Sequence, residues 1–221
     1  MLRLDRGLGY NRVARKLLHI TGCVFAFFVG VLQWWVFLLF ALTGLALAYY
    51  LKPDHGFLRS ITKPVDRKLG MISGVRGYFW AATCLALLWP LLNEVFHLPN
   101  TERYIAFGWL ALTLGDGLAG LVGPKATKFT AVPWNLDKTW LGVVGCCVGA
   151  LIGFVVAFGM LQIKGESAGL TLTSLLLLGS ICGVLVGLVE SLRAPIDDNY
   201  TVGLGAPLIA LLVMGLSGLG P

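Results

Sequence analysis

Long apolar stretches separated by short polar segments dominate the chain. Several stretches reach the roughly 20 residues that a helix needs to cross the hydrocarbon core of a bilayer. Their residues are continuously apolar instead of alternating with polar ones, which favours helices over the strands of a closed barrel. The pattern predicts one domain over residues 1–221, an all-α polytopic membrane protein with about seven spans: 14–32, 34–51, 75–92, 103–123, 140–163, 169–192 and 200–219.

Composition and charge support lipid as the solvent of this chain. Hydrophobic residues make up 57% and charged residues only 13%, against about 25% charged in soluble domains. If the predicted spans hold, all lysines and arginines except Arg103 and Lys164 lie on one side of the membrane. The positive-inside rule makes that side cytoplasmic, with the N-terminus inside and the C-terminus outside. The net charge of +6 is then explained by the orientation of the chain in the membrane and by attraction for anionic lipid or phosphate. Nucleic-acid binding is not expected.

Three predicted cytoplasmic segments are long enough to have their own structure. Residues 1–13 form a basic arm, and residues 124–139 form a loop rich in Pro, Thr and Lys. Residues 52–74 mix basic and apolar side chains, as in a segment lying along the membrane interface, with Pro64 breaking it in two. The five cysteines fall in spans without any metal-binding spacing, which predicts packing roles.

Small residues recur at spacings of three and four in three of the predicted spans. Such spacing puts them on one helix face, where they let helix backbones approach closely in lipid. We therefore expect the fourth, fifth and sixth spans to form a compact inner bundle. The small residues are Gly115, Ala119 and Gly123; Gly142, Gly145, Gly149 and Gly153; and Gly179, Gly183, Gly187 and Ser191.

Asp116 lies within the fourth apolar stretch. Ionisable groups at membrane depth cost several kcal/mol (~3 on translocon-based scales) and usually serve a function. Asp116 either pairs with a basic side chain to hold helices together or provides a carboxylate ligand for Mg²⁺.

Lys138 and Thr139 precede the fifth span. Lys138 is either a lysine that extends its ammonium to the membrane surface or a contact for phosphate groups. Thr139 is placed to cap the helix that follows, whose free N–H groups favour anions.

Further polar residues cluster around the ends of the first, sixth and seventh spans. Glu190 closes the sixth span, and the run Asp197-Asp198-Asn199 opens the seventh. These residues form either a solvated turn with a helix cap or a second acidic group opposite Asp116. At the first span, Arg15 and His19 are four residues apart and share a face, with Lys16 beside them.

Together these motifs resemble the CTP-dependent lipid alcohol kinases, which include dolichol kinase, phytol kinase and the CTP-using diacylglycerol kinases. The phytol kinase branch is the most similar. Four blocks in order along most of the chain carry the resemblance: Arg15-Lys16-x-x-His19; Gly115-Asp116-x-x-Ala119-x-x-x-Gly123; Pro133-Trp134-Asn135-x-x-Lys138-Thr139-Trp140-x-Gly142; and Glu190-Ser191 with Asp197-Asp198-Asn199-x-Thr201-Val202.

The resemblance implies transfer of the γ-phosphate of CTP to the hydroxyl of a membrane lipid alcohol, with Mg²⁺, at a site on the cytoplasmic side. Asp116, Lys138, Glu190 and Asp198 are then the expected catalytic residues. The expected metal ligands are Asp116, Asp197, Asp198 and Glu190. The expected nucleotide-binding residues are Arg15, Lys16, His19, Lys125, Thr139 and Asn199.

Two positions depart from the family pattern. Gly203 stands where phytol kinases usually have proline, which affects local geometry. Pro124 stands where an arginine is common, so that Lys125 becomes the expected source of that charge.

Two other functions compete with this interpretation. A CTP-dependent cytidylyltransferase, such as a CDP-diacylglycerol synthase, shares a Gly-Asp helix and a Lys-Thr-x-x-Gly. It continues with Lys-Asp and Gly-Gly segments, which this chain lacks after Glu190. A small transporter would also carry acids in its spans, but these acids gather at one membrane face and no inverted repeat is seen. The sequence leaves open which alcohol is used, and whether CTP or ATP is the donor.

Overall fold

The computed structural model describes residues 10–29, 31–52, 56–68, 72–126, 130–160, 169–193 and 197–218. The basic arm predicted over residues 1–13 therefore lies mostly outside the described residues. In chain order the elements are α1 (Arg12–Thr21), the 3₁₀ helix η1 (Gly22–Phe28), α2 (Trp34–Tyr50), α3 (Gly56–Ile61), α4 (Pro64–Lys68), α5 (Ser73–Pro90), the π-helical turn η2 (Leu91–Val95), α6 (Thr101–Leu110), the π-helical turn η3 (Ala111–Gly115), α7 (Asp116–Val122), η4 (Gly123–Lys125), β1 (Ala131–Val132), β2 (Asn135–Thr139), α8 (Trp140–Val155), the π-helical turn η6 (Val156–Met160), α9 (Leu172–Ser191) and α10 (Asp198–Leu216).

Five helical segments are long and apolar enough to cross a membrane, and they match the last five predicted spans: Ser73–Val95, Thr101–Lys125, Trp140–Gly159, Leu172–Ser191 and Asp198–Leu216. The second predicted span appears as α2, an apolar helix of 17 residues. The first is divided between α1 and the tighter 3₁₀ turns of η1. The count of seven spans and the side of the N-terminus remain predictions.

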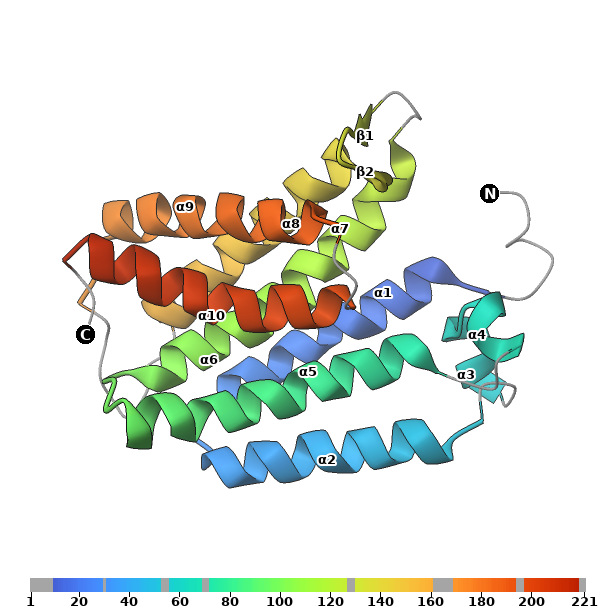
Figure 1. Cartoon of the computed structure of the whole chain (residues 1–221), viewed down its shortest axis with the longest axis horizontal. Coiled ribbons are helices and arrows are strands. Elements are labelled where there is room, and N and C mark those ends of the chain that lie inside the picture. The colour runs from blue at the N-terminus through green and yellow to red at the C-terminus, as the bar shows by residue number, and fades with distance from the viewer. Residues whose placement is uncertain are drawn as a thin grey trace.

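The segment α6–η3–α7 forms the centre of the bundle. All ten residues of α6 are buried, and α6 packs against α5, α8 and α10. The indole of Trp109 donates to the carbonyl of Gly22 at 2.7 Å, which fixes η1 against this central segment. In Figure 1 the long helices run side by side, with α3, α4 and the β1–β2 hairpin at one end of the bundle. The starts of α1 and α10 lie towards that same end.

The small-residue faces pack as the sequence predicts, because α8 lies between α7 and α9 at backbone distance. A methyl group added at Gly149 would lie 2.5 Å from the carbonyl oxygen of Leu114. One added at Gly183 would lie 2.7 Å from the carbonyl oxygen of Cys147. The cysteines are free thiols, two of them fully buried in this region, in keeping with packing roles.

The prediction of an all-helical chain missed one element. Within 124–139, predicted as a loop, strands β1 and β2 pair antiparallel with Ala131 opposite Thr139 and Val132 opposite Asn135. The strands are too short to show an alternating pattern, and Pro133 and Trp134 form the turn between them. By contrast, the interruption at Pro64 is confirmed, since α3 ends at Ile61 and Pro64 begins the separate helix α4. Proline is accepted in a first helical turn because its missing N–H has no partner to lose there.

We predict that Gly149→Ala destabilises the bundle, since the added methyl would force α8 away from the backbone of η3. Overpacking of this kind costs about 1–3 kcal/mol. Gly215→Ala is the matched control, because nothing lies within 4 Å of a methyl at that helical position. Thermal unfolding in detergent should show a lower midpoint for Gly149→Ala and an equal or higher midpoint for Gly215→Ala. Equal midpoints for both variants would contradict the close packing.

Candidate functional site

Lys16, His19 and Asp116 form a first group of charged side chains, called here the Asp116 cluster. The ammonium of Lys16 lies 2.7 Å from Oδ2 of Asp116 and also donates to the Asp116 carbonyl at 3.1 Å. The Lys16 side chain crosses α7 at Gly120, where an added methyl would lie 2.0 Å from its Cε. Asp116 therefore pairs with a basic side chain and joins two helices, which is one of the two roles expected for it, and its partner Lys16 comes from α1.

His19 approaches the same carboxylate. Its Nε2 lies 3.3 Å from Oδ2 of Asp116 and 2.9 Å from the carbonyl oxygen of Leu112. Since a carbonyl oxygen only accepts, Nε2 carries a hydrogen and donates it. Leu112 belongs to η3, whose wide π-helical turn ends immediately before Asp116. Turns of this type occur often at functional sites.

Lys138, Glu190 and Asp198 form a second group, called here the Lys138 cluster. The Lys138 ammonium donates to Oε1 of Glu190 and, at 2.6 Å, to Oδ2 of Asp198. Three elements contribute, since Lys138 lies on β2, Glu190 near the end of α9 and Asp198 at the start of α10. The Glu190 side chain is 4% exposed and that of Asp198 is 44% exposed, so the cluster extends from the interior to the surface.

The charge of Lys138 is stabilised by its partners. Burial of the ammonium opposes protonation, but the carboxylates of Glu190 and Asp198 outweigh burial and raise the pKa of Lys138 above its ordinary value of 10.5. Lys138 therefore remains a cation at neutral pH.

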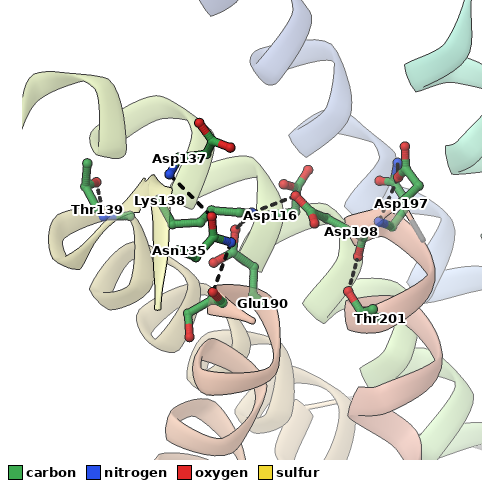
Figure 2. A network of polar contacts seen from close by, with 12 residues as sticks. Asp116, Asn135, Asp137, Lys138, Thr139, Glu190, Asp197, Asp198 and Thr201 are labelled. Atoms are coloured by element: carbon green, nitrogen blue, oxygen red, sulfur yellow. Dashed lines mark hydrogen bonds and ion pairs between the residues drawn. The ribbon is translucent and has the colours of Figure 1, made fainter. Parts of the chain in front are cut away.

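The two clusters occupy one region of the bundle. Lys138 interacts electrostatically with Asp116 as well as with its direct partners. Figure 2 shows Asp116, Lys138, Glu190 and Asp198 gathered where β2 meets the ends of α9 and α10. Residues more than 180 positions apart in the sequence, such as Lys16 and Asp198, thus contribute to one polar region.

The hairpin that carries Lys138 is fixed to α9 by two side chains that were not among the predicted site residues. The amide of Asn135 donates to the Ser191 carbonyl at 3.1 Å, and the indole of Trp134 donates to the Ser191 hydroxyl at 3.1 Å. Both residues belong to the Pro-Trp-Asn motif, which was the signal available for them. Thr139 caps α8 as predicted, accepting from the Gly142 N–H at 3.1 Å.

Other predicted site residues lie outside the two clusters. Asp197 caps α10 and accepts from Asn199, and its carboxylate lies against α5 at Gly77. Arg15 lies against Gly74 and donates to the Tyr10 hydroxyl at 3.3 Å. Lys125 is exposed on η4.

Two buried oxygens stand without a hydrogen-bond partner among the described residues: Oε2 of Glu190 and Oδ1 of Asn199. A buried acceptor without a donor is costly, so each such atom calls for an explanation. In the described part of the chain, no three His, Cys, Asp or Glu side chains converge into a ready-made metal site. Any cation bound here would need further oxygen ligands from water or substrate.

Comparison with known proteins gives one relevant likeness. A phytol kinase from Synechocystis sp. is 27% identical over 207 residues, which cover 90% of this chain and 78% of that protein. No family model matches the chain, and no solved structure matches it. The distant likeness supports at most a relationship to lipid kinases. Together with the five long apolar helices, it supports an integral membrane protein.

We predict strong coupling between Lys16 and Asp116, because removing one member of a buried ion pair leaves the other charge uncompensated. Lys16→Met and Asp116→Asn should each lower the unfolding free energy by about 3 kcal/mol. The double variant should lose less than the sum, by about 0.5–3 kcal/mol. Unfolding of the four proteins in the same detergent measures this coupling, and strictly additive losses would contradict it.

The pH dependence of the Lys138 cluster follows from the raised pKa of its lysine. A group whose pKa is higher in the folded state stabilises the fold fully below its unfolded pKa, and loses that contribution as the pH rises through the folded value. We therefore predict that the stability difference between wild type and Lys138→Met stays constant from about pH 7 to 9. It should shrink only in solutions more alkaline than the ordinary lysine pKa of 10.5. A difference that fades near neutral pH in unfolding experiments would be inconsistent with this pairing.

Proposed function

We propose that this protein is a lipid alcohol kinase that transfers the γ-phosphate of CTP to the hydroxyl group of a membrane lipid alcohol. The observation that carries the proposal is Lys138 held between Glu190 and Asp198, beside the Asp116 cluster. Phosphoryl transfer depends mainly on positioning and on neutralising charge, which lysines and carboxylates supply. The likeness to a phytol kinase supports an isoprenoid alcohol as the acceptor.

The donor set fits Mg²⁺. This ion prefers oxygen ligands and is usually held by one or two carboxylates, with water and substrate phosphates completing its shell. Glu190 offers a buried, unpartnered carboxylate oxygen, and Asp116 offers a second carboxylate in the same region. When bound, the ion would neutralise phosphate charge. At the start of α10, Asn199 would offer a further oxygen, its buried and unpartnered Oδ1.

The lysines are proposed to bind phosphate oxygens. In the described structure, Lys16 and Lys138 contact carboxylates, and the anionic phosphates of a bound nucleotide would compete for the same ammonium groups. Lys138 serves the nucleotide phosphates, and Lys16 assists from α1. His19 lies beside the Asp116 carboxylate, with its ring held in place by the bond from Nε2–H to the Leu112 carbonyl.

Asp198 is the proposed proton acceptor, because its carboxylate is the accessible one in the Lys138 cluster. The alcohol oxygen attacks the γ-phosphorus and forms a new P–O bond. The bond from the γ-phosphorus to the bridging oxygen breaks, the nucleoside diphosphate leaves, and the alcohol proton passes to Asp198. We place this chemistry on the cytoplasmic side, in line with the distribution of basic residues.

The proposal is tested by an activity assay on the purified chain in lipid nanodiscs. The assay supplies γ-labelled CTP or ATP, Mg²⁺ and one of four alcohols: phytol, polyprenol, farnesol or diacylglycerol. A kinase places the label on the lipid, and product mass identifies the acceptor. In a parallel reaction with phosphatidate, a cytidylyltransferase would instead release labelled pyrophosphate and attach the cytidylyl group to the lipid phosphate. Absence of lipid labelling with every pair of substrates would reject the kinase assignment.

We predict that Asp116→Asn and Lys138→Ala each lower kcat/KM at least about 100-fold, the scale of losing one charge-stabilising contact in a transition state. Asp137→Asn is the matched control, since Asp137 is exposed, adjoins Lys138 on β2 and belongs to neither cluster. Its kcat/KM should stay within a few-fold of wild type. Full turnover by a folded Asp116→Asn or Lys138→Ala protein would contradict the site.

A further inference from the structure

An apolar stripe on α8 leads towards the β1–β2 hairpin. Four exposed apolar side chains lie four residues apart along α8, at Trp140, Val144, Val148 and Ile152, and this spacing puts them on one helix face. Since α8 is long and apolar enough to cross a membrane, this face is suited to contact lipid. At the start of the stripe, the rings of Trp140 and Trp134 pack edge to face with centroids 5.5 Å apart.

A second stripe approaches the hairpin from α9. Its exposed members are Leu177, Ile181, Val184, Leu188 and Leu192. The Trp134 indole donates to Ser191, the residue before the last member of this stripe. The hairpin therefore lies where the exposed apolar faces of two candidate spans end.

The hairpin itself exposes apolar side chains close to Lys138. Leu136 is 80% exposed and Trp134 is 47% exposed. The hairpin is nevertheless held firmly in place, because the Asn135 side chain is hydrogen-bonded to Ser191 and Val132 is fully buried. An anchored hairpin that presents tryptophan and leucine outwards needs an apolar or amphipathic partner to cover them.

We propose that the hairpin, residues 131–139, is seated in the boundary between headgroups and acyl chains of the bilayer, with Trp134, Leu136 and Trp140 in contact with lipid. The continuity with the apolar faces of α8 and α9 identifies the partner as a lipid surface. Tryptophan favours this boundary because its ring is apolar while its N–H is polar. Lys138, two residues beyond Leu136, is thereby held at headgroup depth, where the hydroxyl of a membrane-dissolved alcohol lies.

Photolabelling of the full chain in nanodiscs tests the proposal without requiring catalysis. The bilayer contains two phospholipid probes, one with a diazirine on the acyl chain near the headgroup and one with a diazirine at mid-chain to reach Val148, and mass spectrometry locates the adducts. Adducts are expected on Trp134, Leu136 and Trp140, and on Val148 as an internal standard for lipid contact. Trp109, which is fully buried, should remain free of them. Adducts on Val148 without any on the hairpin would overturn the proposal, as would photo-crosslinks joining hairpins of two copies.

Two substitutions sharpen the test. Leu136→Glu should reduce the adducts on the neighbouring Trp134 several-fold relative to Val148, because a carboxylate at position 136 keeps water in place of acyl chains against the anchored hairpin. Leu136→Phe should retain them. Unchanged labelling in Leu136→Glu would show that lipid contact does not depend on this side chain and would overturn the proposal. The labelling pattern is independent of phosphoryl transfer, so a protein without kinase activity can still confirm it.

Discussion

The pairing of lysines with carboxylates inside an apolar bundle is the constraint on which the site depends. A charge removed from water must find an opposite charge or hydrogen-bond partners, or it costs several kcal/mol (~3 or more). Lys16 and Asp116 meet this requirement at 2.7 Å, and Lys138 meets it with two carboxylates. Because these partners come from α1, α7, β2, α9 and α10, satisfying the charges brings five elements to one end of the bundle.

Close packing of helix backbones supplies the rigid frame behind the site. The central helix α6 is buried along its whole length, and glycines on α8 and α9 let their neighbours approach to backbone contact. In lipid, such contact is a main source of helix association, because side chains gain little by leaving one apolar medium for another. Asp116 and Glu190 lie on segments that belong to this frame, so their carboxylates are held by packing as well as by charge.

Much of this arrangement could be predicted from the sequence, because it follows from strong local signals. Five spans, the Thr139 cap and the small-residue faces all come from periodicity and composition, and the polar residues of the motifs do gather at one end. The hairpin could not be foreseen, because its strands are too short to show an alternating pattern and its anchors to Ser191 are tertiary contacts. The choice of Lys16 over Arg15 as partner of Asp116 was likewise beyond the sequence, since it depends on space at Gly120. The roles of Mg²⁺ and CTP remain predictions.

The π-helical turn η3 makes the length of the central segment matter as much as its hydropathy. Each residue of an α-helix advances about 100° around the axis, given 3.6 residues per turn. If the same five residues, Ala111–Gly115, formed ordinary α-helix instead, α7 would be rotated by about that angle, because a π turn takes up about one residue more than an α turn. Asp116 would then be carried away from Lys16 and His19 while the stretch stayed equally apolar. Related chains that keep this carboxylate are thus expected either to keep five residues in a wide turn here or to form ordinary helix with one residue fewer.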